Sequence, residues 1–205
     1  MGKIVRLPSR KECELLWHEH ATPHHVRAHA MQVSRIARAL SRALISAGTC
    51  VRIDLVDRAS LLHDLIRVTQ WAKIDPSRLQ YTPTPKELAV WERQRRTFSN
   101  AIPHAQVTAS VLEHHYPELA HVIALHSFSS VNELRSIEEK IVYYADRRVA
   151  HDRIVSLTER MNEAEGRYPA ESPEAKERER VLRMSVYTLE EELFSSLDVT
   201  PDQLL

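Results

Sequence analysis

The sequence contains only three glycines in 205 residues, too few for the many tight turns of a sheet-rich fold. Leu, Ala, Glu and Arg are plentiful, and apolar residues recur at spacings of three and four along the chain. Because these residues favour helices and this spacing is that of an amphipathic helix, we predict an all-α protein.

Cysteine is also scarce, and long apolar runs and an excess charge of either sign are missing. The two cysteines, Cys13 and Cys50, lie far apart and in no metal-binding spacing, which argues against a disulfide scaffold or a zinc ribbon. No segment approaches the roughly 20 apolar residues of a membrane span. Lys plus Arg and Asp plus Glu number 28 each, so no net charge draws the chain to nucleic acid or an anionic membrane. We expect a soluble, cytoplasmic protein that acts through a specific site.

Capping residues and prolines divide the chain into helices. The first helix is predicted to begin at Ser9, the second to have Thr22 as its N-cap and Pro23 at its first position, and the third to have Asp54 as its cap. Later helices are predicted to begin at Pro85, Pro103, Pro117, Ser136 and Pro173. The second ends at Gly48, the third runs to about Arg67, and the helix from Ser136 continues until Gly166 and Tyr168-Pro169. Between Val68 and Pro85 the pattern weakens, which indicates a loop or lid.

Six polar residues lie on or beside the apolar faces of these predicted helices: His29, His63, Asp64, His104, His126 and Asp146. Burying an unpaired polar group costs roughly 1–3 kcal/mol even on a mild scale, so such groups need partners. A metal ion would satisfy imidazoles and carboxylates together. Taken singly, His29 could instead be a hydrogen-bonded core histidine, and His104 a residue at a solvated helix end.

The order and surroundings of these residues resemble the HD superfamily of metal-dependent phosphohydrolases over about residues 22–160. The resemblance rests on His29-Ala30-Met31-Gln32-Val33, Leu61-Leu62-His63-Asp64, His104 with its following helix, Ile123-Ala124-Leu125-His126 and Ile141-Val142-Tyr143-Tyr144-Ala145-Asp146. It implies an HD-domain-like helical bundle in a single domain of residues 1–205, with residues 161–205 as a C-terminal helical extension. In that family, the positions of His29, His63, Asp64 and Asp146 bind a metal ion. Further histidines, here His104 and His126, can hold a second ion.

Three features differ from many members of that superfamily. Arg67 stands where many have a lysine, the stretch between Asp64 and His104 is long, and His126 has no adjacent histidine. Such an adjacent pair occurs in the cyclic-dinucleotide phosphodiesterases of the HD-GYP type. The resemblance therefore does not identify the substrate.

A divalent ion held by imidazoles and carboxylates suits the hydrolysis of a phosphoester. The donor set is compatible with Fe, Mn, Co, Ni, Zn or Mg, and with one ion or two. A bound cation lowers the pKa of water toward about 7 and offsets the charge of a phosphoryl oxygen. Asp64 would be shared between ions or orient the water, and phosphate could be held by Arg67, Lys73, Arg147 or Arg148.

The leading interpretation is a metal-dependent phosphohydrolase that cleaves a phosphomonoester or phosphoanhydride of a nucleotide or similar small metabolite. The alternative is a non-catalytic regulatory protein of HD fold that binds a metal ion and a nucleotide. Nucleic-acid binding through the arginines at positions 93–96 ranks last, because the neutral composition supplies no basic surface. His104 and His126 either hold a second ion or donate hydrogen bonds to the substrate phosphate.

The remaining histidines and two tryptophans carry weaker signals. Surface positions are predicted for His18, His20, His24 and His25, and surface or supporting positions for His114, His115 and His121. Trp71 and Trp91 either wall a nucleobase pocket or, as is more common for large aromatic residues, pack in the core.

Overall fold

The computed structural model describes residues 6–167 and 171–204. The α-helices are α1 (Arg10–Glu19), α2 (His24–Ser46), α3 (Ile53–Leu62), α4 (Pro85–Thr97), α5 (His104–Leu112), α6 (Pro117–Ala124), α7 (Ile137–Asp146), α8 (Leu157–Arg167) and α9 (Pro173–Phe194). Short 3₁₀ helices are η1 (Arg67–Gln70), η2 (Pro76–Arg78), η3 (Phe128–Glu133) and η4 (Pro201–Gln203). Strands β1 (Val149–Ala150) and β2 (Arg153–Ile154) form an antiparallel hairpin with Val149 opposite Ile154. The prediction of an all-α fold is confirmed.

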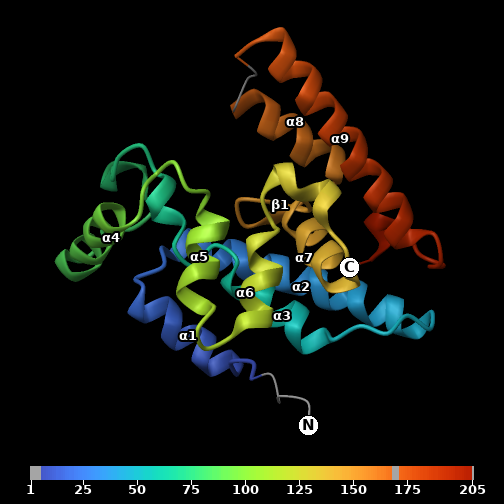
Figure 1. Cartoon of the computed structure of the whole chain (residues 1–205), viewed down its shortest axis with the longest axis horizontal. Coiled ribbons are helices and arrows are strands. Elements are labelled where there is room, and N and C mark those ends of the chain that lie inside the picture. The colour runs from blue at the N-terminus through green and yellow to red at the C-terminus, as the bar shows by residue number, and fades with distance from the viewer. Residues whose placement is uncertain (1–5, 168–170, 205) are drawn as a thin grey trace.

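The centre of the bundle consists of α2, α3 and α7, which pack against one another (Figure 1). Helix α6 packs on α3 and α7, and α5 packs on α6. The predicted apolar stripe of α2 is buried: Val26, Ala30, Val33, Ile36, Ala37, Leu40 and Leu44. Burying one large aliphatic side chain contributes about 1.5–3 kcal/mol, so this stripe determines which face of α2 the bundle covers.

The helix starts agree with the sequence only in part. Capping boxes begin α1 and α4 as predicted, with the pairs Ser9 and Glu12, and Thr84 and Glu87. The predicted caps of α2 and α3 are wrong, because Pro23 and Arg52 hold the N-cap positions and neither helix has a side-chain cap. The hydroxyl of Thr22 donates instead to the Leu65 carbonyl at 2.9 Å, which ties the segment before α2 to the turn after α3.

Helix α3 ends at Leu62, earlier than the predicted end near Arg67. Carbonyl groups that a longer helix would use accept hydrogen bonds from distant side chains. The Trp17 indole N–H, for example, donates to the Leu61 carbonyl at 3.0 Å. Because these long-range bonds replace helical ones, His63-Asp64 follows the helix in a turn.

The long helix predicted from Ser136 is interrupted after Asp146 by the β1–β2 hairpin, and α8 then follows as a separate helix. His151, in the hairpin turn, has a φ of +59°, in the left-handed region. The ten residues between α7 and α8 contain no proline or glycine, which explains why the sequence pattern gave no break. Helix α8 continues through Gly166, and the break predicted at Tyr168-Pro169 lies outside the described residues.

Residues 67–98, which we call the insert, have a small apolar core of their own. As predicted for a loop or lid, residues 67–84 contain only the 3₁₀ helices η1 and η2, and α4 follows. The insert packs on the α1–α2 turn through a cluster of Ala21, Val68 and Trp91, with Trp71, Ile74, Leu79, Tyr81, Leu88 and Val90 against it. Trp91 is fully buried and donates to the Ala21 carbonyl at 2.6 Å, so it is a packing residue.

Helix α8 and the first half of α9 extend away from the rest of the bundle (Figure 1). The second half of α9 docks through Val186, Leu189 and Leu193, as predicted, and packs on α7 and η3. Among residues 6–167 and 171–204, no helix combines the length and the apolar character that crossing a membrane requires.

Candidate metal centre

The six residues predicted as metal ligands lie together, although they come from five separate parts of the fold. They are His29 on α2, His63 and Asp64 after α3, His104 at the start of α5, His126 after α6 and Asp146 at the end of α7. The three histidines outside α2 are buried, and the other members are half-buried. The site therefore forms where the ends of central helices meet.

One group of donors comprises His29, His63 and Asp64, whose ligand atoms lie within 4.8 Å of one another. Asp146 adjoins this group, with its Oδ1 atom 2.9 Å from His29 Nε2 and 3.5 Å from His63 Nε2. Two imidazoles and two carboxylates thus converge on one volume. Such a mixed set suits a divalent transition metal.

A second group comprises Asp64, His104 and His126, again with ligand atoms within 4.8 Å of one another. Asp64 Oδ1 lies 2.8 Å from His104 Nε2 and 3.6 Å from His126 Nε2. The two Nε2 atoms are themselves 2.9 Å apart. Asp64 is the member common to both groups, so the centre has space and donors for two adjacent ions.

Backbone carbonyls determine which nitrogen carries the proton in three of the imidazole rings. The Nδ1 atoms of His29, His63 and His126 lie 2.8, 2.8 and 2.7 Å from the carbonyl oxygens of His151, Ser60 and Ile123. Because a carbonyl can only accept, each Nδ1 carries a proton, and each Nε2 of a neutral ring presents a lone pair to the centre. Metal-binding histidines commonly have this orientation.

Two buried atoms at the centre form no hydrogen bond with any described residue: His63 Nε2 and Asp64 Oδ1. Leaving a buried donor or acceptor unpaired costs about 1–3 kcal/mol. A divalent cation between the two donor groups would satisfy both atoms, since it binds lone pairs rather than protons. The residues present therefore fit a metal ion.

The charges at the centre strongly perturb the pKa values of its members. Burial lowers the pKa of the His63 imidazole, but Asp64 and Asp146 outweigh burial and raise it to about 9. Burial also lowers the pKa of His104, to about 4, against the attraction of Asp64. Burial would raise the pKa of both carboxyl groups, but the cationic and hydrogen-bonding groups around them hold both well below the usual range. At neutral pH His63 thus carries a proton where a cation would bind.

Metal binding should therefore release a proton from His63. Its Nδ1 already donates to the Ser60 carbonyl, so the displaced proton is the one on Nε2. Calorimetric titration of metal-free protein with Mn²⁺, in two buffers of different ionisation enthalpy, should show about one proton released per chain at pH 7. Because the pKa of His63 is about 9, the contribution of His63 to this number should fall toward zero as the pH rises past that value. An exposed-histidine variant, His114→Ala, should behave like the wild type, and a proton count independent of pH would contradict the assignment.

Arg67 and Gln70, both on η1, adjoin the second donor group. Arg67 Nη1 lies 2.6 Å from His104 Nε2 and 3.7 Å from Asp64 Oδ1, and the Arg67 side chain is 33% exposed. The Gln70 side-chain oxygen accepts a hydrogen bond from His104 Nδ1. The structure therefore brings Arg67 to the site, as the sequence predicts. Gln70 was missed because an exposed glutamine in an irregular segment gives no periodic signal.

Three other residues predicted to hold phosphate are engaged elsewhere. Arg147 is buried, donates to two backbone carbonyls at 2.8 Å each and lies 3.1 Å from Asp146 Oδ2, so it positions that carboxylate. Arg148 is buried and bonds to residues of the C-terminal η4. Lys73 is exposed and lies 3.5 Å from Asp75. The burial of Arg147 and Arg148 speaks against their roles in phosphate binding, and the sequence does not show which arginines the fold encloses. The assignment of Lys73 to phosphate stays a prediction.

The other histidines lie outside both donor groups. His18, His24, His25, His114, His115 and His121 are exposed, and His20 is half-buried. His151 contributes through its backbone carbonyl, which orients His29. Sequence reasoning missed this contribution because a carbonyl group carries no side-chain signal.

Comparison with known proteins agrees with this geometry. The HD domain family matches residues 26–150, a range that contains the five residues of the two donor groups and also Asp146. No curated protein and no solved structure matches the chain. HD domains are typical of metal-dependent phosphohydrolases. The match covers more than half of the sequence, and the chain belongs to the HD domain family.

Proposed function

We propose that the chain is a metal-dependent phosphohydrolase that cleaves a phosphomonoester or phosphoanhydride of a nucleotide or a similar small metabolite. The proposed ligands of one or two divalent ions are His29, His63, Asp64, His104, His126 and Asp146. When bound, such an ion supplies an activated water and offsets the charge of the phosphoryl oxygens. Membership of the HD domain family supports this proposal.

The observation that carries the proposal is the position of Asp64 between the two donor groups. Its Oδ1 atom is buried without a hydrogen bond and lies within 4 Å of the imidazoles of His104 and His126. A purely structural aspartate in the same place would be paired with hydrogen-bond donors. The unpaired oxygen therefore supports a role in binding a cation.

Two residues have further roles in the proposed reaction. Asp64 stays ionised at neutral pH, since Arg67 and His63 outweigh the effect of burial and hold its pKa well below the usual range. It would accept a hydrogen bond from the attacking water. The Arg67 guanidinium is partly exposed beside Asp64, so it can donate to a phosphate oxygen of a substrate entering from solvent.

A phosphate-release panel tests the proposal. The protein is purified without a histidine tag, its metal content is measured, and nucleoside mono-, di- and triphosphates and sugar phosphates are supplied with added Mn²⁺ or Fe²⁺. We expect bound metal, release of phosphate or pyrophosphate from at least one class, and loss of release on chelation. Arg67→Ala should lower turnover while leaving metal content unchanged.

Bound metal without turnover of any compound in the panel would contradict catalysis. If nucleotides nevertheless bound to the metal-loaded protein, the non-catalytic regulatory alternative would replace the present proposal. Absence of bound metal after reconstitution would contradict both.

A further inference from the structure

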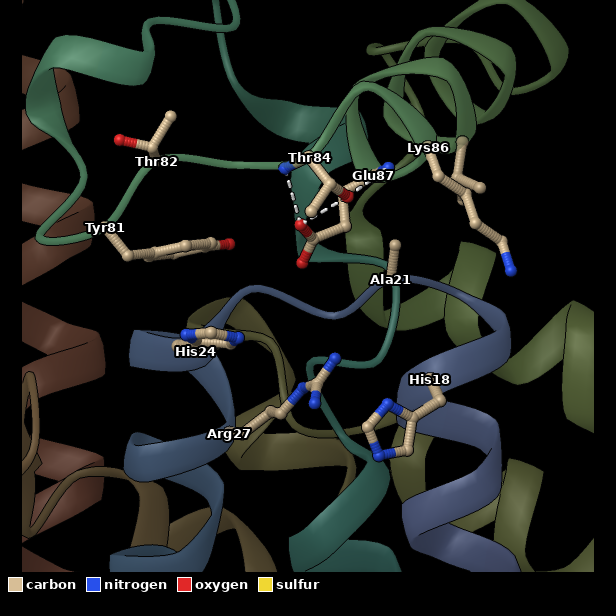
Figure 2. A pocket seen from close by; sticks show the side chains of 10 residues that line it. His18, Ala21, His24, Arg27, Tyr81, Thr82, Thr84, Lys86 and Glu87 are labelled. Atoms are coloured by element: carbon tan, nitrogen blue, oxygen red, sulfur yellow. Dashed lines mark hydrogen bonds between the residues drawn. The ribbon is translucent and has the colours of Figure 1, made fainter.

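A cavity of about 390 Å³ lies between the insert and the α1–α2 turn. One wall comes from the insert and contains Tyr81, Thr82, Thr84, Lys86, Glu87 and Val90; the other contains His18, Ala21, His24 and Arg27. Figure 2 shows the Arg27 guanidinium between His24 and His18, facing the Thr84 and Glu87 side chains. The volume of the cavity lies within the range of small-molecule sites in proteins.

Positive charge exceeds negative charge in this cavity. The Arg27 guanidinium is half-buried and donates only to backbone carbonyls, to Thr22 at 2.6 Å and to Trp17 at 3.2 Å, and no described carboxylate forms an ion pair with it. Lys86 is exposed at the rim. The one carboxylate, Glu87, accepts hydrogen bonds from the backbone and hydroxyl of Thr84 at 2.8 Å each. A half-buried arginine without a carboxylate partner favours an anionic ligand.

Further donors face the same cavity. The Tyr81 and His24 rings stack with centroids 4.0 Å apart, and no described residue accepts a hydrogen bond from the buried Tyr81 hydroxyl. His24 begins α2, a helix with no side-chain cap, so the positive end of its dipole adds to the field of Arg27 and Lys86. Donors thus converge from both walls, as the several acceptor oxygens of a phosphate group require.

The cavity is separate from the candidate metal centre. Arg27 and His29 are two residues apart on α2, so their side chains leave the helix on nearly opposite sides. His29 faces Asp146, whereas Arg27 faces the insert. None of the cavity-lining residues belongs to the donor groups.

We propose that this cavity is a second binding site, which takes a small phosphorylated metabolite. Its phosphate would lie between Arg27 and Lys86 and accept a hydrogen bond from the Tyr81 hydroxyl. The cavity is larger than inorganic phosphate needs, and its apolar wall at Ala21 and Val90 would contact the organic part of the ligand.

Calorimetric titration of the full chain with AMP and with ribose 5-phosphate tests the site. Asp64→Ala serves as the background, so that binding at the metal centre does not contribute. We expect one saturable event per chain. Lys86→Gln and Tyr81→Phe, each added to this background, should weaken it about tenfold or more, the effect of losing one hydrogen bond to a charged group. Lys176→Gln, a matched change at an exposed lysine on α9, should leave the affinity unchanged.

The melting temperature separates a binding role of Tyr81 from a structural one. Because no described residue accepts its hydroxyl proton, Tyr81→Phe should not lower the melting temperature of the ligand-free chain. Absence of binding by both probes, or binding that survives Lys86→Gln and Tyr81→Phe unchanged, would overturn the proposal. Neither result bears on hydrolysis at the metal centre, which the phosphate-release panel measures in the wild-type chain.

Discussion

Asp64→Ala is expected to abolish metal binding and hydrolysis together while leaving the helical content unchanged. Asp64 is the only residue common to both donor groups, so one substitution removes a ligand from each. Loss of an outer-shell partner alone typically costs about 10–100-fold in metal affinity, and loss of a shared ligand should cost more. The apolar stripes that build the bundle are untouched, so far-UV circular dichroism should match the wild type. Metal content and phosphate release measure the two functional effects.

Two variants make this result specific. Asp54→Ala removes an exposed carboxylate from the first turn of α3 and should retain both metal and activity. Asp64→Asn keeps the shape of the side chain but not its charge, and should fail like Asp64→Ala. If either Asp64 variant retained wild-type metal content and turnover, the proposed centre would be wrong.

Two ions per chain are expected when metal-free protein is titrated with Mn²⁺ or Fe²⁺. His29, His63 and Asp146 with Asp64 provide donors for one ion, and His104 and His126 with Asp64 provide donors for another. Two ions about 3.5–4 Å apart would clamp the attacking and non-bridging oxygens of a phosphate. The double variant His104→Ala, His126→Ala should bind close to one ion, measured by equilibrium dialysis with elemental analysis.

The competing account assigns His104 and His126 to the substrate rather than to a metal. Burial lowers the pKa of both imidazoles, so both are neutral near pH 7, and each would have to give its single ring proton to phosphate instead of to Gln70 or Ile123. That account requires single stoichiometry in the wild type and in the double variant, with only substrate affinity reduced. The lone pair that His126 presents, because its Nδ1 proton is held by the Ile123 carbonyl, favours the two-ion account.

The sequence predicted the helices and the candidate ligands wherever the signal was local. The phase of His29 in the stripe of α2 predicted its inward direction, and the capping boxes predicted the starts of α1 and α4. The His63-Asp64 pair between apolar residues was unusual enough to identify by composition alone. These features depend on residues within one or two helical turns of each other.

The features that the sequence did not predict depend on residues far apart along the chain. Trp17 donates to the Leu61 carbonyl in the last turn of α3, and Thr22 donates to the Leu65 carbonyl just beyond the helix. No local pattern records these long-range contacts, so the early end of α3 was not predicted. The hairpin after Asp146 contains no turn-favouring glycine or proline, and its path depends on packing against α2. Distant contacts also decide whether an arginine binds phosphate or instead supports a carboxylate, as Arg147 does.

The insert has a separate apolar core, so the free energy of unfolding the insert locally differs from the free energy of unfolding the whole chain. Val68 and Trp91 belong to a cluster distinct from the large core that holds α2, α3 and α7 together. Segments with few apolar contacts open locally at a lower cost than global unfolding, and their amide protons exchange faster. Since η1 at the start of the insert carries Arg67 and Gln70, each opening would withdraw both side chains from His104 while the bundle stays folded. Local unfolding of the insert would thus control access to the centre without moving the helices that carry its ligands.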